Sequence, residues 1–113
     1  MKIDYKGIMQ NVVTFKKTGT IAEGDFVKMS SNDTVAKCSD GDNFIGIAVN
    51  VNGDLAAVQI TGFAEVEVAE TVGTGVKLLS VDDAGKLEIT ETGRSCLVVN
   101  NNTTLGTAVI YFS

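Results

Sequence analysis

The sequence predicts an all-β fold, a small single-domain β-barrel or sandwich built from two pseudo-repeated β units and preceded by an extended N-terminal arm. Apolar and polar residues alternate along most of the chain, and no convincing window shows the three-and-four apolar spacing of a helix. Turn residues separate the alternating runs at about 8–12-residue intervals, as in sandwiches and barrels. One phrase occurs twice, as AEGDFVKMSSNDTVAK (22–37) and TVGTGVKLLSVDDAGK (71–86), with a constant offset of 49 residues.

Strands are expected on both sides of each turn in the first half. NVVTF (11–15) is the first, and the next two flank the turn Ser31-Asn32-Asp33. Asn52-Gly53 lies between two further alternating runs and predicts a two-residue hairpin turn. The strands expected here are 11–15, 25–30, 34–39, 44–51 and 54–61.

The second half repeats this arrangement. FAEVEVA (63–69) alternates so that its acidic residues share one face, as in a half-buried strand. The turn Asp82-Asp83-Ala84-Gly85 predicts a hairpin, and a longer one follows around the loop NNTTLG (101–106). The strands expected here are 63–69, 76–81, 86–91, 95–100 and 107–113.

The duplication predicts that residues 24–61 and 73–113 form two similar units related by a pseudo-twofold axis. Residues 1–10 lie outside the repeat and are expected to form an arm ahead of a β domain over 11–113. A half-barrel repeated within one domain removes exposed sheet edges, which is useful in a chain with no proline to protect them.

The composition of the chain disfavours two classes of partner, nucleic acids and membranes. The chain has 113 residues and a net charge of −5, and no nucleic acid is expected as a partner because such binding depends on Lys and Arg. No apolar run is long enough to cross a bilayer, and MKIDYKGIMQ does not have the form of a signal peptide, so no membrane partner is expected.

No catalytic or metal site is predicted. The chain has no histidine, the commonest general base and metal ligand. The acidic stretch Asp40-Gly41-Asp42-Asn43 does not have the spacing of an EF-hand loop and is expected to be a solvated turn. Cys38 and Cys96 are expected to be buried free thiols, with a disulfide as the alternative. No cofactor is expected.

Lys28, in the phrase Val27-Lys28-Met29, has two interpretations. Biotinyl domains place a lysine beside methionines at an exposed hairpin tip. Here only Met29 flanks the lysine and the position lies within an expected strand, so an outward-pointing strand lysine is the preferred interpretation.

The segments IAEGDFVKMSSNDTVAKCSDGDNFIGIAVN (21–50) and GDLAAVQITGFAEVEVA (53–69) resemble the capsid decoration, or cement, proteins of tailed bacteriophages. The similarity lies in Gly24-Asp25, Gly46-Ile47-Ala48, Gly53-Asp54 and Gly62 with the strand after it. The second copy departs from the pattern, because Thr74 follows Gly73 and the later hairpin lacks Gly-Asp.

The resemblance implies a non-enzymatic structural protein, assembled in the host cytoplasm and found on the outer capsid surface of the virion, where it stabilises the shell. The implied partner is the major capsid protein, with self-association on the capsid as a further possibility. The implied contact is the arm, which could add a strand to an exposed sheet edge of the shell. Its candidate partner-binding residues are Met1, Lys2, Ile3, Asp4, Tyr5, Lys6, Ile8 and Met9.

Two alternatives stay open. The arm could instead be a frayed terminus or the domain's own first strand. The chain could be another phage or surface β module, from a tail, a fibre or a glycan-binding protein. The absence of tryptophan disfavours glycan binding, because sugars are usually held by stacking on aromatic rings.

Overall fold

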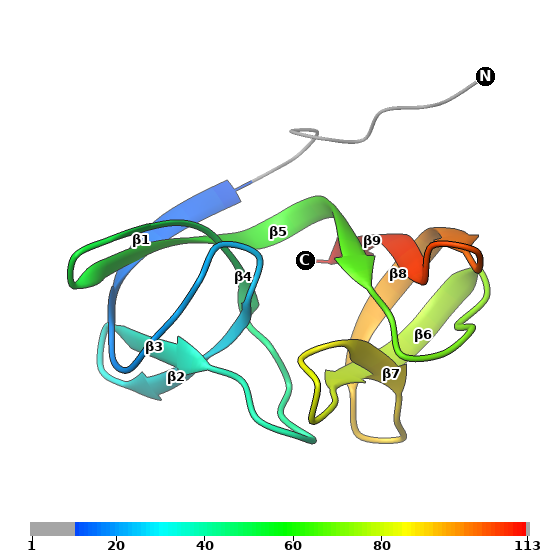
Figure 1. The fold of residues 1–113 in the computed structure, drawn as a ribbon, viewed down its shortest axis with the longest axis horizontal. Coiled ribbons are helices and arrows are strands. Elements are labelled where there is room, and N and C mark those ends of the chain that lie inside the picture. The colour runs from blue at the N-terminus through cyan, green and yellow to red at the C-terminus, as the bar shows by residue number, and fades with distance from the viewer. Residues whose placement is uncertain (1–10, 113) are drawn as a thin grey trace.

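The computed structural model describes residues 11–112, and this part of the chain is all-β, with nine strands and no helix (Figure 1). The predicted fold class is therefore confirmed. The strands are β1 (Asn11–Lys17), β2 (Phe26–Ser31), β3 (Thr34–Lys37), β4 (Gly46–Asn52), β5 (Leu55–Glu67), β6 (Gly75–Val81), β7 (Leu87–Ile89), β8 (Arg94–Asn102) and β9 (Thr107–Phe112).

The first unit, residues 11–61, is a small closed barrel of five strands. The hairpins β2–β3 and β4–β5 are joined by pairing between β2 and β4. β1 closes the ring, because it pairs antiparallel with β5 on one side and parallel with β3 on the other. The parallel contact includes the pair Lys17 and Val35.

The second unit, residues 62–112, repeats this topology. The hairpins β6–β7 and β8–β9 are joined through β6 and β8, and the end of β5 takes the place of β1 by pairing antiparallel with β9. A single parallel bridge between Val68 and Leu87 closes the ring, where Lys17 pairs with Val35 in the first unit.

One strand belongs to both units. The sequence predicts two strands, 54–61 and 63–69, but β5 runs unbroken for 13 residues and spans the molecule in Figure 1. Its pairing changes from β4 and β1 to β9 near Gly62, which has a φ of 116°. L side chains rarely adopt this conformation, and the glycine lets the strand turn from one barrel into the other without ending.

The repeat is real, but its register differs from the predicted offset of 49. Bulges fall between Ala48 and Asn50 in the first unit and between Val98 and Asn100 in the second, so β4 and β8 align at an offset of 50. The strand partners of these residues align β5 with β9 at an offset of 52 residues. The parallel contacts of Val35 and Leu87 align β3 with β7 at the same offset.

This correction changes which residues are equivalent. The sequence alignment matches Val27 with Val76, yet Val27 is fully buried and Val76 is 71% exposed. In the pairing of the strands, Val76 faces Leu97 as Phe26 faces Ile47. Val27 and Val76 still lie in equivalent strands, β2 and β6, although they are not equivalent residues. The predicted duplication therefore holds for the order and pairing of the strands.

The hairpin predicted at Asn52-Gly53 is present, with its turn one residue later. Asn52 pairs with Leu55, so the two loop residues are Gly53 and Asp54. Gly53 has a φ of 61° and Asp54 does not have a positive φ, which is the pattern of a type II′ turn. The predicted turn over residues 82–85 is also present, with the Asp82 carboxylate accepting hydrogen bonds from the backbone N–H groups of Ala84 and Lys86.

The units meet through unlike faces, which we describe with two equivalent rows of side chains. Paired residues on adjacent strands define the first-unit row, Phe26, Ile47, Gln59 and Val12, and the second-unit row, Val76, Leu97, Tyr111 and Phe63. Phe26 and Ile47 are buried in one hydrophobic cluster with the interior residues of the second unit, such as Val66 and Val81. The interior of the first unit forms a separate cluster.

The contact between the units buries different residues on its two sides, whereas an exact twofold interface buries the same residues on both. The predicted pseudo-twofold axis itself stays a prediction. Phe26 is 5% exposed, whereas its counterpart Val76 is 71% exposed. The face of the first unit that contains Phe26 packs against interior residues of the second unit. The corresponding position on the second unit, Val76, is exposed to solvent.

Candidate functional site

The arm predicted to bind a partner, residues 1–10 with its eight candidate contacts, lies outside the described residues. The described chain starts at Asn11, whose side-chain amide donates a hydrogen bond to Thr61 Oγ1 over 2.9 Å. β1 belongs to the first barrel, since it pairs with β5 from Asn11 to Lys16. The arm thus precedes a strand that is fixed within the domain.

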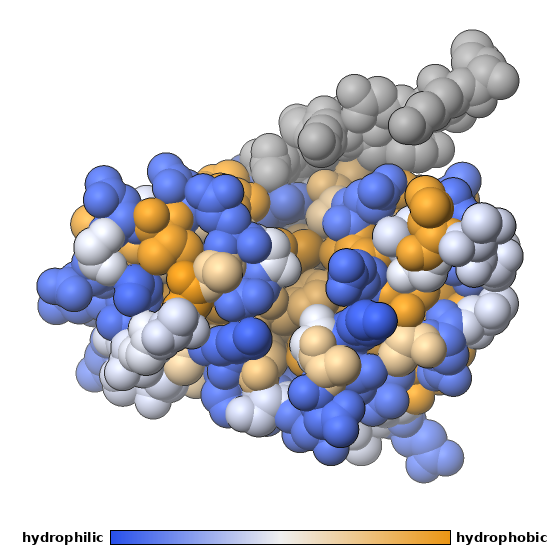
Figure 2. All heavy atoms as spheres, viewed as in Figure 1, coloured by the Kyte–Doolittle hydropathy of each residue, from blue (hydrophilic) through white to orange (hydrophobic). Residues whose placement is uncertain are grey.

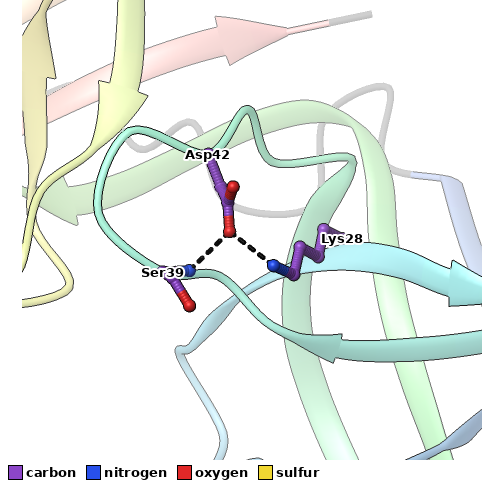
Figure 3. Close-up of polar contacts among 3 residues, drawn as sticks. All are labelled: Lys28, Ser39 and Asp42. Atoms are coloured by element: carbon purple, nitrogen blue, oxygen red, sulfur yellow. Dashed lines mark hydrogen bonds and ion pairs between the residues drawn. The ribbon is translucent and has the colours of Figure 1, made fainter.

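Lys28 holds a loop in place. It lies within β2, and its ammonium group donates to Asp42 Oδ2 over 2.6 Å (Figure 3). The Ser39 backbone N–H donates to the same oxygen over 2.7 Å. Hydrogen bonding to Asp42 raises the pKa of Lys28, and the hydrogen bonds from Lys28 and Ser39 lower the pKa of Asp42. Lys28 lies within a strand rather than at a hairpin tip, and its ammonium group has an ionic partner, both of which fit the strand-lysine interpretation.

The loop from Cys38 to Ile45 connects β3 to β4 and contacts the second unit. Gly41 N–H donates to Val81 O over 2.7 Å, and Val81 N–H donates to Asp42 O over 3.1 Å. The acidic stretch 40–43 is therefore a structural turn. Among residues 11–112, no cluster of three or more His, Cys, Asp or Glu side chains could hold a metal ion.

Arg94 fixes this loop from the second unit, a role that the sequence analysis missed. Its guanidinium donates to the carbonyl oxygens of Phe44 and Ile45 over 3.2 and 2.9 Å. It also lies 5.2 Å from the centroid of the Phe44 ring and 5.0 Å from that of Phe112. Burial lowers the pKa of Arg94. The available signal was that Arg94 is the chain's single arginine among eight lysines, placed at a strand start.

A cleft of about 380 Å³ lies between the units. Apolar residues of both units line it, including Phe26, Ile47, Val66 and Val81, and four carboxylates also lie on its wall (Glu23, Asp25, Glu65 and Glu67). The space-filling view shows apolar surface in the recess between the two halves (Figure 2). Lys37 also lines the cleft, and its ammonium group lies 3.8 Å from Asp25 Oδ2, so the polar part of the lining is mixed in charge.

The thiol in the wall of the cleft is a poor nucleophile. Cys38 lines it, but burial raises the pKa of this thiol to about 12, and the thiolate is the nucleophilic form. Burial also raises the pKa of Cys96 to about 11. Both cysteines are free and buried, which confirms the prediction of buried free thiols.

Exposed apolar side chains form the remaining distinctive feature. Val76 and Leu97 of the second-unit row are exposed, and its Phe63 and Tyr111 rings pack at a centroid distance of 4.9 Å. Leu78 lies on the same face of β6, two residues after Val76, and is also exposed. Apolar surface is visible over both units in Figure 2.

Comparisons with known proteins add no family. Neither a scan against protein-family models nor a search of curated proteins gives a match.

No helix in residues 11–112 is long and apolar enough to span a membrane.

Proposed function

We propose that the chain is a structural capsid decoration protein, which binds the outer surface of a phage capsid shell, stabilises it and catalyses no reaction. The partner is the major capsid protein, contacted by the N-terminal arm and one face of the β domain. The protein would act in the virion after assembly in the host cytoplasm.

The observation that carries this proposal is the position of the glycines that the sequence shares with decoration proteins. Gly24, Gly53 and Gly62 have positive φ angles of 91°, 61° and 116°. At Gly46 a Cβ atom would overlap the backbone carbonyl oxygen of Gln59 on the neighbouring strand. All four glycines of the pattern thus have a structural reason in this fold, and this agreement supports the proposal.

The chemistry of the chain is consistent with a binding role. There is no histidine in the sequence, and both thiols are buried with raised pKa values. The best-defined polar contacts, from Lys28 and Arg94, hold the loop between β3 and β4, which contacts the second unit. These side chains contribute to rigidity, which a protein that reinforces a shell requires.

The test is co-sedimentation with expanded capsids that lack decoration protein, from the phage that encodes this chain. We expect the full chain to bind saturably, and a variant without residues 1–10 to remain folded but lose most of its occupancy. Strand addition by the arm would contribute about 0.5–1.5 kcal/mol for each net hydrogen bond. Each large apolar anchor that is fully buried would add about 1.5–3 kcal/mol.

The experiment tests capsid binding and the role of the arm independently. If the intact chain does not bind the shells, the capsid function is wrong. If the truncated chain reaches the same occupancy as the intact chain, the arm is not the contact. Circular dichroism of the truncated variant provides the control for folding.

A further inference from the structure

The cleft between the two units has an excess of negative charge. Its wall contains one ammonium group, that of Lys37, and four carboxylates, those of Glu23, Asp25, Glu65 and Glu67. Lys37 lies 3.8 Å from Asp25. Within residues 11–112 no ion pair involves the other three carboxylates, so the charge of the cleft favours a cationic occupant.

The cleft is also lined by apolar side chains. Phe26 and Ile47 of the first unit and Val66 and Val81 of the second unit contribute to the lining, and each is less than one-tenth exposed. The volume of about 380 Å³ lies in the range of cavities that hold a ligand. An occupant that carries both cationic and apolar groups would therefore match this surface.

One wall of the cleft is the edge of a strand. From Glu65 to Glu67, β5 pairs with β9, and no other strand of residues 11–112 runs along this segment. The opposite wall includes Ala84 and Gly85, in the turn between β6 and β7. An extended peptide in the cleft could form main-chain hydrogen bonds with the edge of β5.

The N-terminal arm has the composition that this cleft requires. Residues 1–10 contain two lysines and one aspartate, so the arm has a net charge of +1 in a chain of net charge −5. Its polar residues Lys2, Asp4 and Lys6 alternate with Ile3 and Tyr5. This alternation is typical of an extended segment with one polar and one apolar face.

The arm is long enough to reach the cleft. It ends at Asn11, which lies opposite Thr61 on β5. Because β1 runs antiparallel to β5, the chain before Asn11 leads toward the later residues of β5. Glu65 and Glu67 follow Thr61 by about 13–20 Å along that strand, at about 3.3 Å per residue. Ten extended residues span about 33 Å.

From this agreement of charge, lining and reach, we infer that residues 1–10 dock in the cleft of their own chain in the free protein. Lys2 and Lys6 lie beside the carboxylates, and the main chain of the arm follows the edge of β5. The inference concerns the free chain and does not depend on the proposed capsid function. On a capsid shell the arm would leave the cleft and pair with the capsid protein instead.

The test is hydrogen–deuterium exchange of the full chain, read by mass spectrometry of the peptide that covers residues 1–10. Exchange there should be about tenfold slower than in a synthetic peptide of the same sequence, which corresponds to a docked arm in about nine chains of ten. Glu65→Lys/Glu67→Lys should abolish this protection by repelling the arm. Asp40→Lys/Glu91→Lys, at exposed positions outside the cleft, is the control and should exchange as the wild type does.

Reversing the charges on both partners provides a second readout. Lys2→Glu/Lys6→Glu should also abolish the protection of the arm. Combining these substitutions with Glu65→Lys/Glu67→Lys should restore protection, because opposite charges face each other again. Raising NaCl to about 0.5 M should weaken protection in the wild type by screening the charges. Four-substitution protein that is folded but shows no restored protection would contradict the pairing of these charges.

Protein concentration distinguishes the arm of the same chain from the arm of a second copy. Protection should not change with concentration if the arm docks in its own chain. Protection that rises with concentration would place the arm of another copy in the cleft and would overturn the proposal. So would a wild-type arm that exchanges as fast as the synthetic peptide. If circular dichroism shows that Glu65→Lys/Glu67→Lys is unfolded, Glu23→Lys/Glu67→Lys takes its place with the same expected result.

Discussion

At the residue scale, the polar side chains of the domain stabilise loops. The side chains of Lys28 and Asp42 are each about one-third exposed, and their 2.6 Å ion pair links β2 to the β3–β4 loop. Exposed ion pairs are usually weak, but this one is supported by a second hydrogen bond to Asp42 from Ser39. Its contribution should therefore be visible through its pH dependence.

Replacing Lys28 by methionine should reduce stability in a pH-dependent way. The lowered pKa of Asp42 means that its contribution is present above the ordinary value of 3.8 and is lost as pH falls through the folded-state pKa. The raised pKa of Lys28 means that its contribution is present below 10.5 and is lost as pH rises through the folded-state value. Urea unfolding of the wild type and Lys28→Met across this range measures the difference.

The difference between the two proteins should be largest at intermediate pH and should shrink at both extremes. Lys86→Met, at an exposed turn position, is the control and should show little difference at any pH. A Lys28→Met effect that stays constant from acid to alkaline pH would contradict the assignment of the ion pair.

At the element scale, the shared strand β5 and the glycines beside it determine how the two barrels close. Gly46 begins β4 where a Cβ atom would overlap the Gln59 carbonyl oxygen, and backbone there cannot move without disturbing the β4–β5 ladder. Gly53 lies in the hairpin turn at positive φ with open space around it. The two glycines are required for different reasons, one steric and one conformational.

Alanine at these two positions should therefore have different effects. Gly53→Ala should cost about 1–2 kcal/mol, the ordinary penalty for a side chain in the left-handed region. Gly46→Ala should cost more, about 3 kcal/mol or above, because a backbone clash in a close-packed interior forces the strands apart. Urea denaturation monitored by circular dichroism measures both, and equal losses would show that the close approach at Gly46 is not a constraint.

At the scale of the whole molecule, we expect the two units to unfold as one cooperative body. They share β5, and residues from both belong to one hydrophobic cluster. Arg94 joins them by donating to carbonyl groups of the first unit and by lying against the rings of Phe44 and Phe112. A side chain placed at this junction should affect the stability of both units together.

Arg94→Ala should lower the free energy of unfolding by about 2–3 kcal/mol, since it removes hydrogen bonds from a charged donor and a cation–π contact in a partly buried site. The unfolding should remain a single transition with an unchanged denaturant slope. Arg94→Lys should recover only part of the loss, because an ammonium group lacks the planar fork. Lys86→Ala, in an exposed turn, is the control and should change stability by less than about 0.5 kcal/mol; two separate transitions in Arg94→Ala would contradict a single cooperative body.

The sequence by itself determined the strands, most of the turns and the state of the cysteines. Alternation decides which face of a strand is apolar, and the chemistry of Gly53 and of Asp82 decides where a hairpin reverses. Both are local properties of the chain. The same local information identified a duplicated phrase and the absence of histidine, which are the basis of the predicted fold and of the non-enzymatic proposal.

Only the tertiary structure decided the register of the repeat, the continuity of β5 and the role of Arg94. Register depends on which strands pair and where a bulge adds a residue, so the 49-residue match of Val27 with Val76 was replaced by offsets of 50 and 52. Phe26 is buried whereas Val76, at the corresponding position of the second unit, is exposed. This difference depends on how one barrel packs on the other. These are contacts between residues far apart in the chain, and no local pattern encodes them because each depends on the position of the partner.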